Sequence, residues 1–95
     1  MNRTVYKYPL VKGWNTLMLP KKWKYLWLAW QGENLRMWAE VSFGRADTLA
    51  EYRFFVAFTG EPLPDDARQY LGSTMGHFDF IIVAHLYSDQ EPPHA

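Results

Sequence analysis

The chain has 95 residues, no cysteine and a formal net charge of zero. A chain of this length forms one domain with one hydrophobic core. The absence of cysteine excludes disulfides, thiolate metal sites and cysteine nucleophiles, and fits a reducing compartment. The N-terminal residues lack the apolar run of a signal peptide, and no stretch approaches the roughly 18 apolar residues of a membrane span. We therefore expect a cytoplasmic protein that does not enter a membrane.

The charges are divided unevenly along the chain. Residues 1–32 carry six cations and no acid, whereas residues 33–95 carry ten acids and four arginines, a net of −6. If folding keeps these two parts apart, the surface is basic on one side and acidic on another. Residues 21–40 (KKWKYLWLAWQGENLRMWAE) also contain four of the five tryptophans, so aromatic surface coincides with the basic part.

Apolar and polar residues alternate along most of the chain, which predicts β-strands. Lys12-Gly13 and Gly32-Glu33 are the expected turns after the first and third strands, and Pro20 ends the second strand. The segment GRADTLA breaks the alternation before the fifth strand. In chain order, the expected strands cover 3–9, 14–19, 24–31, 35–43, 51–59 and 78–87.

The block 61–73 (EPLPDDARQYLGS) is the one expected non-strand segment, because prolines do not fit a central strand. Within it we expect at most one short helical turn near 65–70, capped by Asp65. Residues 88–95 are polar and are expected to form a flexible tail. The sequence thus predicts a single all-β domain over 1–87, a small antiparallel sandwich or roll of six to seven strands.

The Gly32-Glu33 turn determines which residues of its hairpin share a face. With a two-residue turn, Leu28 pairs with Met37, and one face of the hairpin is continuously apolar. That face is the expected core side. The expected core residues are Leu26, Leu28, Trp30, Met37, Ala39, Val41, Phe54, Val56, Phe80 and Ile82.

The other face of the hairpin combines aromatic rings with charge. This pairing places Trp27 opposite Trp38 and Tyr25 opposite Glu40, with Trp23 further along the strand. Such a face is either covered, with lysine stems over the rings, or exposed for contact with a partner. The expected partner-binding residues are Trp23, Tyr25, Trp27 and Trp38, with Lys21, Lys22, Lys24 and Arg36 at the rim.

Four short segments occur in a recognisable order: YKYPL at 6–10, TGEPLPDD at 59–66, YLGS at 70–73 and VAHLY at 83–87. Together they resemble a family of small uncharacterised all-β proteins from tailed phages and prophages. The resemblance covers nearly the whole chain and implies an all-β fold and a phage origin, but no activity. In that family the third strand alternates apolar with polar residues, and Trp27 stands at a polar position. This departure favours an exposed Trp27.

The sequence offers no convincing catalytic or metal-binding arrangement. His77, Asp79 and His85 could be considered as ligands, but same-face side chains six or more residues apart on a strand lie about 20 Å from each other. No serine stands at a recognisable spacing from a histidine, and a Gly-rich phosphate loop is absent. We therefore expect no enzyme, no metal and no cofactor.

Two adjacent carboxylates follow the proline-rich motif. Asp65 and Asp66 are expected to cap the short helical turn, where free backbone N–H groups favour a negative charge. Together with Glu61 they could instead form an acidic contact patch.

A small chain without catalytic residues is expected to act by binding. Small phage proteins of this kind often bind and inhibit or modulate a host protein complex in the host cytoplasm, and anti-CRISPR activity is the sharpest form of this hypothesis. A single-stranded nucleic-acid-binding module is the first alternative, because Lys21–Trp27 combines cations with aromatic rings. The pI of about 6.8 favours a protein partner over nucleic acid. A virion or self-assembling protein is a further alternative, and a homodimer is left open.

Overall fold

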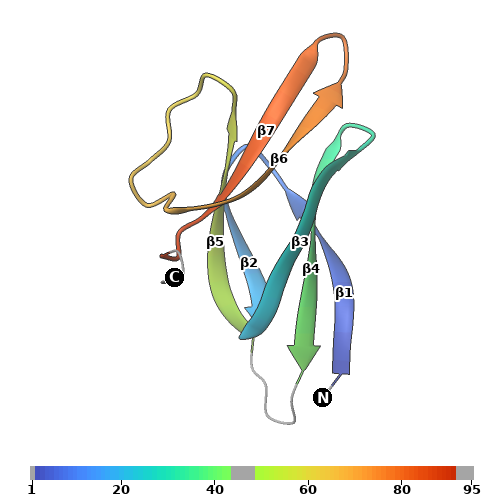
Figure 1. The fold of residues 1–95 in the computed structure, drawn as a ribbon, viewed down its shortest axis with the longest axis vertical. Helices are drawn as coiled ribbons and strands as arrows, with labels where there is room; N and C mark the ends of the chain where they lie inside the picture. The colour runs from blue at the N-terminus through green and yellow to red at the C-terminus, as the bar shows by residue number, and fades with distance from the viewer. Residues whose placement is uncertain (1, 44–48, 92–95) are drawn as a thin grey trace.

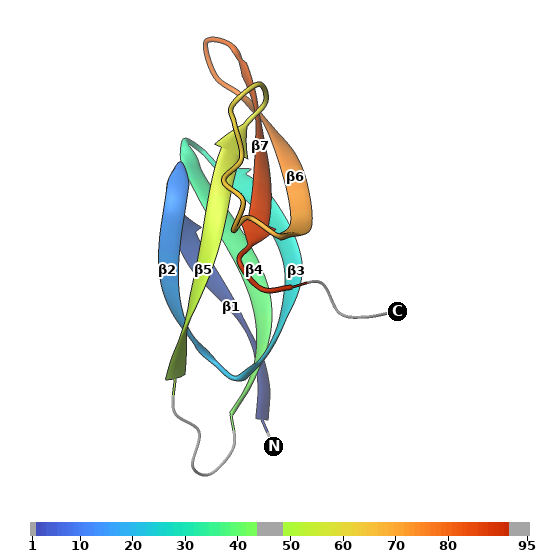
Figure 2. The same ribbon diagram turned by 90° about the vertical axis from the view of Figure 1, so that its left-hand side faces the viewer.

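Seven antiparallel strands in two sheets form the fold of the computed structural model, which describes residues 2–43 and 49–91 (Figure 1). Sheet A has the strand order β1-β4-β3, and sheet B has the order β2-β5-β7-β6. The two sheets pack face to face in a single domain (Figure 2), so the predicted all-β sandwich is confirmed. The strands are β1 (Asn2–Leu10), β2 (Gly13–Pro20), β3 (Lys22–Gln31), β4 (Asn34–Phe43), β5 (Leu49–Phe58), β6 (Gln69–His77) and β7 (Ile81–Ser88).

The turn between β3 and β4 has the predicted form. Gln31 pairs with Asn34, so Gly32 and Glu33 are the two central residues. Gly32 has a φ of 59° while Glu33 does not have a positive φ, as a type II′ hairpin turn requires. A side chain would be strained at this φ, which explains the glycine. From this turn back to Trp27, the predicted register is confirmed.

A β-bulge in the middle of β3 changes the register beyond that point. Leu26 is an extra residue on β3, and Tyr25 pairs with Ala39. The predicted pairing of Tyr25 with Glu40 is therefore wrong. An inserted residue shifts the alternation of side chains by one position. Trp23 and Tyr25 consequently point to the inner face of sheet A, toward sheet B.

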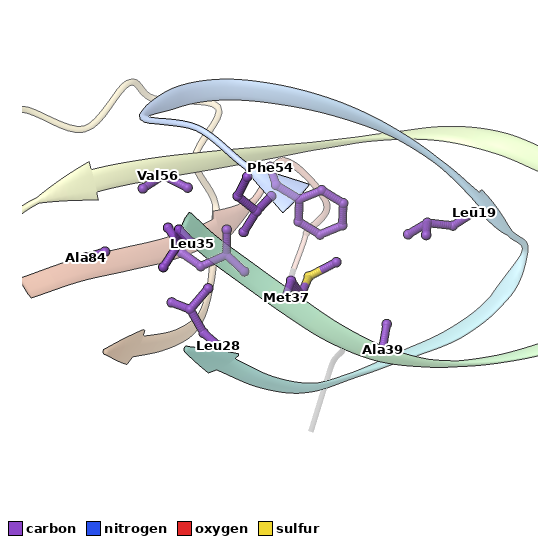
Figure 3. Close-up of a cluster of buried hydrophobic side chains, with 10 residues drawn as sticks. Leu19, Leu28, Leu35, Met37, Ala39, Phe54, Val56 and Ala84 are labelled. Carbon is purple, nitrogen blue, oxygen red and sulfur yellow. The ribbon is translucent and has the colours of Figure 1, made fainter. Parts of the chain in front are cut away.

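The core lies between the two sheets (Figure 3). Leu26 is 41% exposed because of the bulge, and Phe80 is 67% exposed because it lies in the turn before β7; both core predictions are wrong. Trp30 and Ile82 are half-buried. The predicted core residues that are buried are Leu28, Met37, Ala39, Val41, Phe54 and Val56. Further buried residues are Leu10, Leu19, Leu35, Ala84 and Leu86.

The strand β6 begins at Gln69, so the predicted non-strand block 61–73 is wrong for residues 69–73, whereas residues 61–68 lie outside any strand as predicted. Gly72 and Gly76 lower the strand propensity of this segment, so a prediction from propensity does not find the strand. The structure gives a packing reason for both. A Cβ on Gly72 would meet the Tyr25 hydroxyl, and one on Gly76 would meet the Trp30 ring. The glycines thus allow β3 of sheet A to approach β6 of sheet B.

The ends of the expected segments differ slightly from the prediction. Ser88, expected in the tail, is the last residue of β7 and is buried. Residues 92–95 of the predicted tail and 44–48 of the predicted break in the alternation lie outside the described residues.

Replacing Gly72 by alanine should reduce the free energy of unfolding by about 1–3 kcal/mol, because the added methyl group overpacks against Tyr25. Urea unfolding measures this loss. Removing the hydroxyl in Tyr25→Phe should recover part of it. Gly76→Ala is the matched control, since its Cβ would meet Trp30 and Phe78 instead. If Tyr25→Phe restored the free energy of unfolding equally in Gly72→Ala and Gly76→Ala, or in neither variant, the result would contradict the packing described here.

Candidate functional site

The outer face of sheet A, turned away from sheet B, is densely charged. The register places side chains from its three strands in cross-strand rows. Five of these side chains are cations and one is a carboxylate, a net formal charge of +4. We call this surface the basic face. Its charged and large apolar residues are Arg3, Val5 and Lys7 of β1, Arg36, Trp38 and Glu40 of β4, and Lys22, Lys24 and Trp27 of β3.

A tryptophan pair lies at the centre of the basic face. Trp27 lies opposite Trp38, with ring centroids 5.0 Å apart and ring planes inclined by 38°. On the other side of Trp38, Lys7 completes the row. Trp27 is 59% exposed, whereas Trp38 is half-buried. An exposed indole supported by a second indole is a suitable anchor for a partner.

The cations of the basic face differ in their contacts with other side chains of the protein. Arg3 lies 3.7 Å from the Glu40 carboxylate, and the Lys7 ammonium donates a hydrogen bond of 3.0 Å to the Gln31 side chain. Within residues 2–43 and 49–91, no ion pair involves the other cations of this face. Those cations are Lys22, Lys24 and Arg36, and the half-buried Arg36 donates a hydrogen bond of 3.4 Å to the Leu35 carbonyl.

The structure separates the predicted site residues into two groups. Trp27 and Trp38 lie on the basic face as predicted, together with three of the rim cations. Trp23 and Tyr25 do not, because the bulge turns them inward. They line a pocket of about 390 Å³ at the open side of the sandwich, and Lys21 lies beside them.

Trp23 and Tyr25 are held by the core. Trp23 packs edge-on against Tyr52 and Phe54, with ring centroids 5.5 and 5.4 Å apart. Burial raises the pKa of the Tyr25 hydroxyl, and the nearby Tyr70 adds to this increase. Both side chains are half-buried and line this pocket instead of the basic face. The prediction of a four-residue aromatic surface is therefore wrong for these two residues.

Sequence reasoning missed a chain of side-chain hydrogen bonds on the outer face of sheet B. Tyr70 and Ser73 hydroxyls lie 2.7 Å apart, and Ser73 Oγ lies 2.6 Å from His85 Nδ1. His85 Nε2 lies 2.8 Å from the Thr59 hydroxyl. The four residues come from three of the segments on which the phage-family resemblance rests. Only that resemblance could have pointed to them, because they are distant in sequence.

These hydrogen bonds place a hydroxyl next to a histidine, as in a nucleophile and its base, but in the part of the protein that the structure describes no carboxylate is hydrogen-bonded to the His85 ring. A catalytic histidine is oriented by a third group, most often a carboxylate. Here the second ring nitrogen of His85 faces the Thr59 hydroxyl, and the hydrogen bonds are exposed to solvent. The hydrogen bond between Thr59 and His85 connects the start of the 59–68 loop to sheet B.

The acids of the 59–68 loop are also engaged locally. Glu61 accepts a hydrogen bond from the Phe58 N–H and pairs with Lys12. The Lys12 side chain contributes most to lowering the pKa of the Glu61 carboxyl. Asp66 lies 3.8 Å from Arg53. Near the predicted helical turn the loop has one hydrogen-bonded turn, 64–67, but no helix, so the predicted helix capping by aspartates does not occur.

The remaining features of the described residues concern metal ligands, membrane spans and a second pocket. No group of three potential metal ligands occurs among them, and no helix of theirs is long and apolar enough to cross a membrane. A pocket of about 460 Å³ opens at the end of the sandwich, near the β3–β4 turn. It is mainly apolar, with Trp30, Phe58 and Phe78 among its walls.

The fold and this surface define a small β-sandwich with one exposed basic and aromatic face. The chain matches, over residues 1–95, a family described as a domain of unknown function (DUF7352), and it belongs to that family. No curated protein and no solved structure matches the chain. Membership of an uncharacterised family is thus confirmed, while the phage origin stays a prediction.

The different positions of Trp27 and Trp23 predict different effects on stability. Trp27→Ala removes an exposed cross-strand contact and should cost less than about 1 kcal/mol of unfolding free energy. Trp23→Ala removes a ring packed against two core aromatics and should cost about 3 kcal/mol or more. Chemical denaturation of both variants measures the difference. Similar losses for the two variants would contradict the assignment of faces.

Proposed function

We propose that this protein is a non-enzymatic binding domain that docks its basic face on an acidic surface of a partner protein. The observation that carries the proposal is the exposed Trp27, backed by Trp38 on a face that carries five cations and one carboxylate. Tryptophan and arginine dominate the energetics of protein interfaces, usually from a central aromatic anchor with a polar rim. The basic face has this arrangement, with Arg36 and the lysines around the indole pair.

The charge of the face supports an acidic partner. A net formal charge of +4 on one face of a neutral chain speeds the encounter with an acidic surface and disfavours basic ones. The bulge also weakens the nucleic-acid alternative. With Trp23 and Tyr25 turned inward, one tilted indole pair is left on the face instead of a row of four aromatic residues on which successive bases could stack.

The resemblance to phage proteins extends the proposal to the identity of the partner. Under this extension, the partner is a host protein complex, and the domain inhibits or modulates it in the host cytoplasm. A host defence system is the sharpest form, which would make the protein an anti-CRISPR. The small size of the chain supports a stoichiometric binder.

Comparative affinity capture from host lysate tests the proposal. The wild type should recover a partner that Trp27→Ala loses, with the binding free energy reduced by about 2 kcal/mol, or about 30-fold in Kd. Phe80→Ala is the matched control, because Phe80 is also a large exposed residue but lies outside the basic face. Equal recovery by the wild type and Trp27→Ala would contradict the proposal.

The salt dependence of the same interaction separates the alternatives. An aromatic-centred protein interface should lose affinity gradually with salt. Binding to single-stranded nucleic acid would give a steep line in a plot of log affinity against log salt, with a slope of about −0.7 per phosphate contact. Such a slope would favour the nucleic-acid module, and sedimentation with viral particles would favour a virion protein.

A further inference from the structure

Among the residues that the structure describes, no strand pairs with the free side of β1, which forms one edge of sheet A (Figure 1). Its pairing with β4 runs without a bulge from Asn2, opposite Phe43, to Leu10, opposite Leu35. Residues 2–7 are all exposed. The backbone N–H and C=O groups on the free side of a regular edge strand can pair with another strand.

The other three sheet edges are less suited to pairing with an additional strand. The strand β3 has a bulge and packs against β6, and β6 has a bulge after Tyr70. The strand β2 ends at the buried Pro20, and at its start the Asn15 side chain bonds to the Val11 N–H and carbonyl. The edge of β1 is the more exposed of the two edges that lack a bulge.

The charges beside β1 argue against a second copy of this chain as the pairing strand. Arg3 and Lys7 flank Val5 on the outer side of β1. Antiparallel pairing of two copies about a two-fold axis would join two basic faces, each with a net charge of +4, into one continuous sheet. Like charges across adjacent strands destabilise a sheet, and lysines on an edge protect it from self-association. A strand with carboxylates at the matching positions would be attracted instead.

We propose that β1 pairs with an extended acidic segment of a partner protein, which adds a fourth strand to sheet A. Carboxylates at alternate positions of this segment face Arg3 and Lys7, whose contacts with Glu40 and Gln31 lie at the solvent-exposed surface. The residues between them are apolar and face Tyr6 and Tyr8 on the other side of β1. The inference rests on the proposed function and adds how the partner binds. Main-chain hydrogen bonds supply affinity in this mode, and alternate side chains supply specificity.

Synthetic peptides test the inference with the full chain. The probe is an eight-residue peptide in which Glu alternates with Val. One control has the same composition in two blocks, and another has its two central amides N-methylated, which keeps the charge but removes backbone donors from both edges. The alternating peptide should shift the NMR signals of β1 amides. The N-methylated peptide should bind at least tenfold more weakly.

Charge reversal on the protein gives a second, independent readout. Lys7→Glu changes β1, whereas Lys21→Glu makes the same charge change at an exposed lysine outside the basic face. Strand addition predicts a clear loss of peptide affinity for Lys7→Glu and little change for Lys21→Glu.

Two results would overturn the inference. Equal binding of all three peptides with equal losses from both substitutions would mean docking by charge alone, which leaves the proposed function in place. The absence of shifts on β1 at millimolar peptide would overturn strand addition as well. The proposed function is tested separately. It would be contradicted if affinity capture recovered the partner equally with the wild type and with Trp27→Ala.

Discussion

The β-bulge at Leu26 is the constraint on which the rest of this molecule depends. A regular strand would place Tyr25, Trp27 and Leu26 according to strict alternation, and Trp23 would share a face with Trp27. The extra residue reverses the faces on one half of β3 only. One half then supplies aromatic rings to the core, where Trp23 contacts Tyr52 and Phe54, and the other half leaves Trp27 in solvent. Because of this single inserted residue, some aromatic rings of β3 stabilise the core and Trp27 lies on the surface, where it is available for binding.

Strand order explains why the exposed half is basic. The strands β1 and β3 come from the lysine-rich first third of the chain and flank β4 in sheet A. Their outward cations therefore lie on one surface rather than on opposite sides of the sandwich. Lys12 lies outside this surface and pairs with Glu61 of the loop after β5. The remaining cations of the first third, apart from Lys21, form the basic face together with Arg36.

Local patterns in the sequence predicted a large part of the fold. Alternation identified six strands, and Gly32 with its neighbour defined the turn from which the register to Trp27 follows. The bulge could not be predicted, because an extra residue has no local signal; Leu26 is apolar and fits an inward position equally well. The strand β6 was missed because Gly72 and Gly76 serve contacts with another sheet, which a single-sequence pattern does not contain.

The candidate site was predicted in part for the same reason. Trp27 and Trp38 lie in the region of correct register, so their face was predictable. Trp23 and Tyr25 lie beyond the bulge, so the face on which they lie was not predictable. The hydrogen bonds of His85 join residues of three segments, and their geometry becomes visible only in the folded chain.

The central claim is that the bulge separates an exposed Trp27 from an inward-facing Trp23. Hydroxyl-radical labelling followed by mass spectrometry measures the solvent accessibility of each tryptophan in the folded wild type in one experiment. The account predicts that Trp27, which is 59% exposed, is oxidised considerably faster than Trp23, which packs between the sheets. Oxidation of Trp23 as fast as that of Trp27 would mean that both rings lie on one outer face, and would contradict the account.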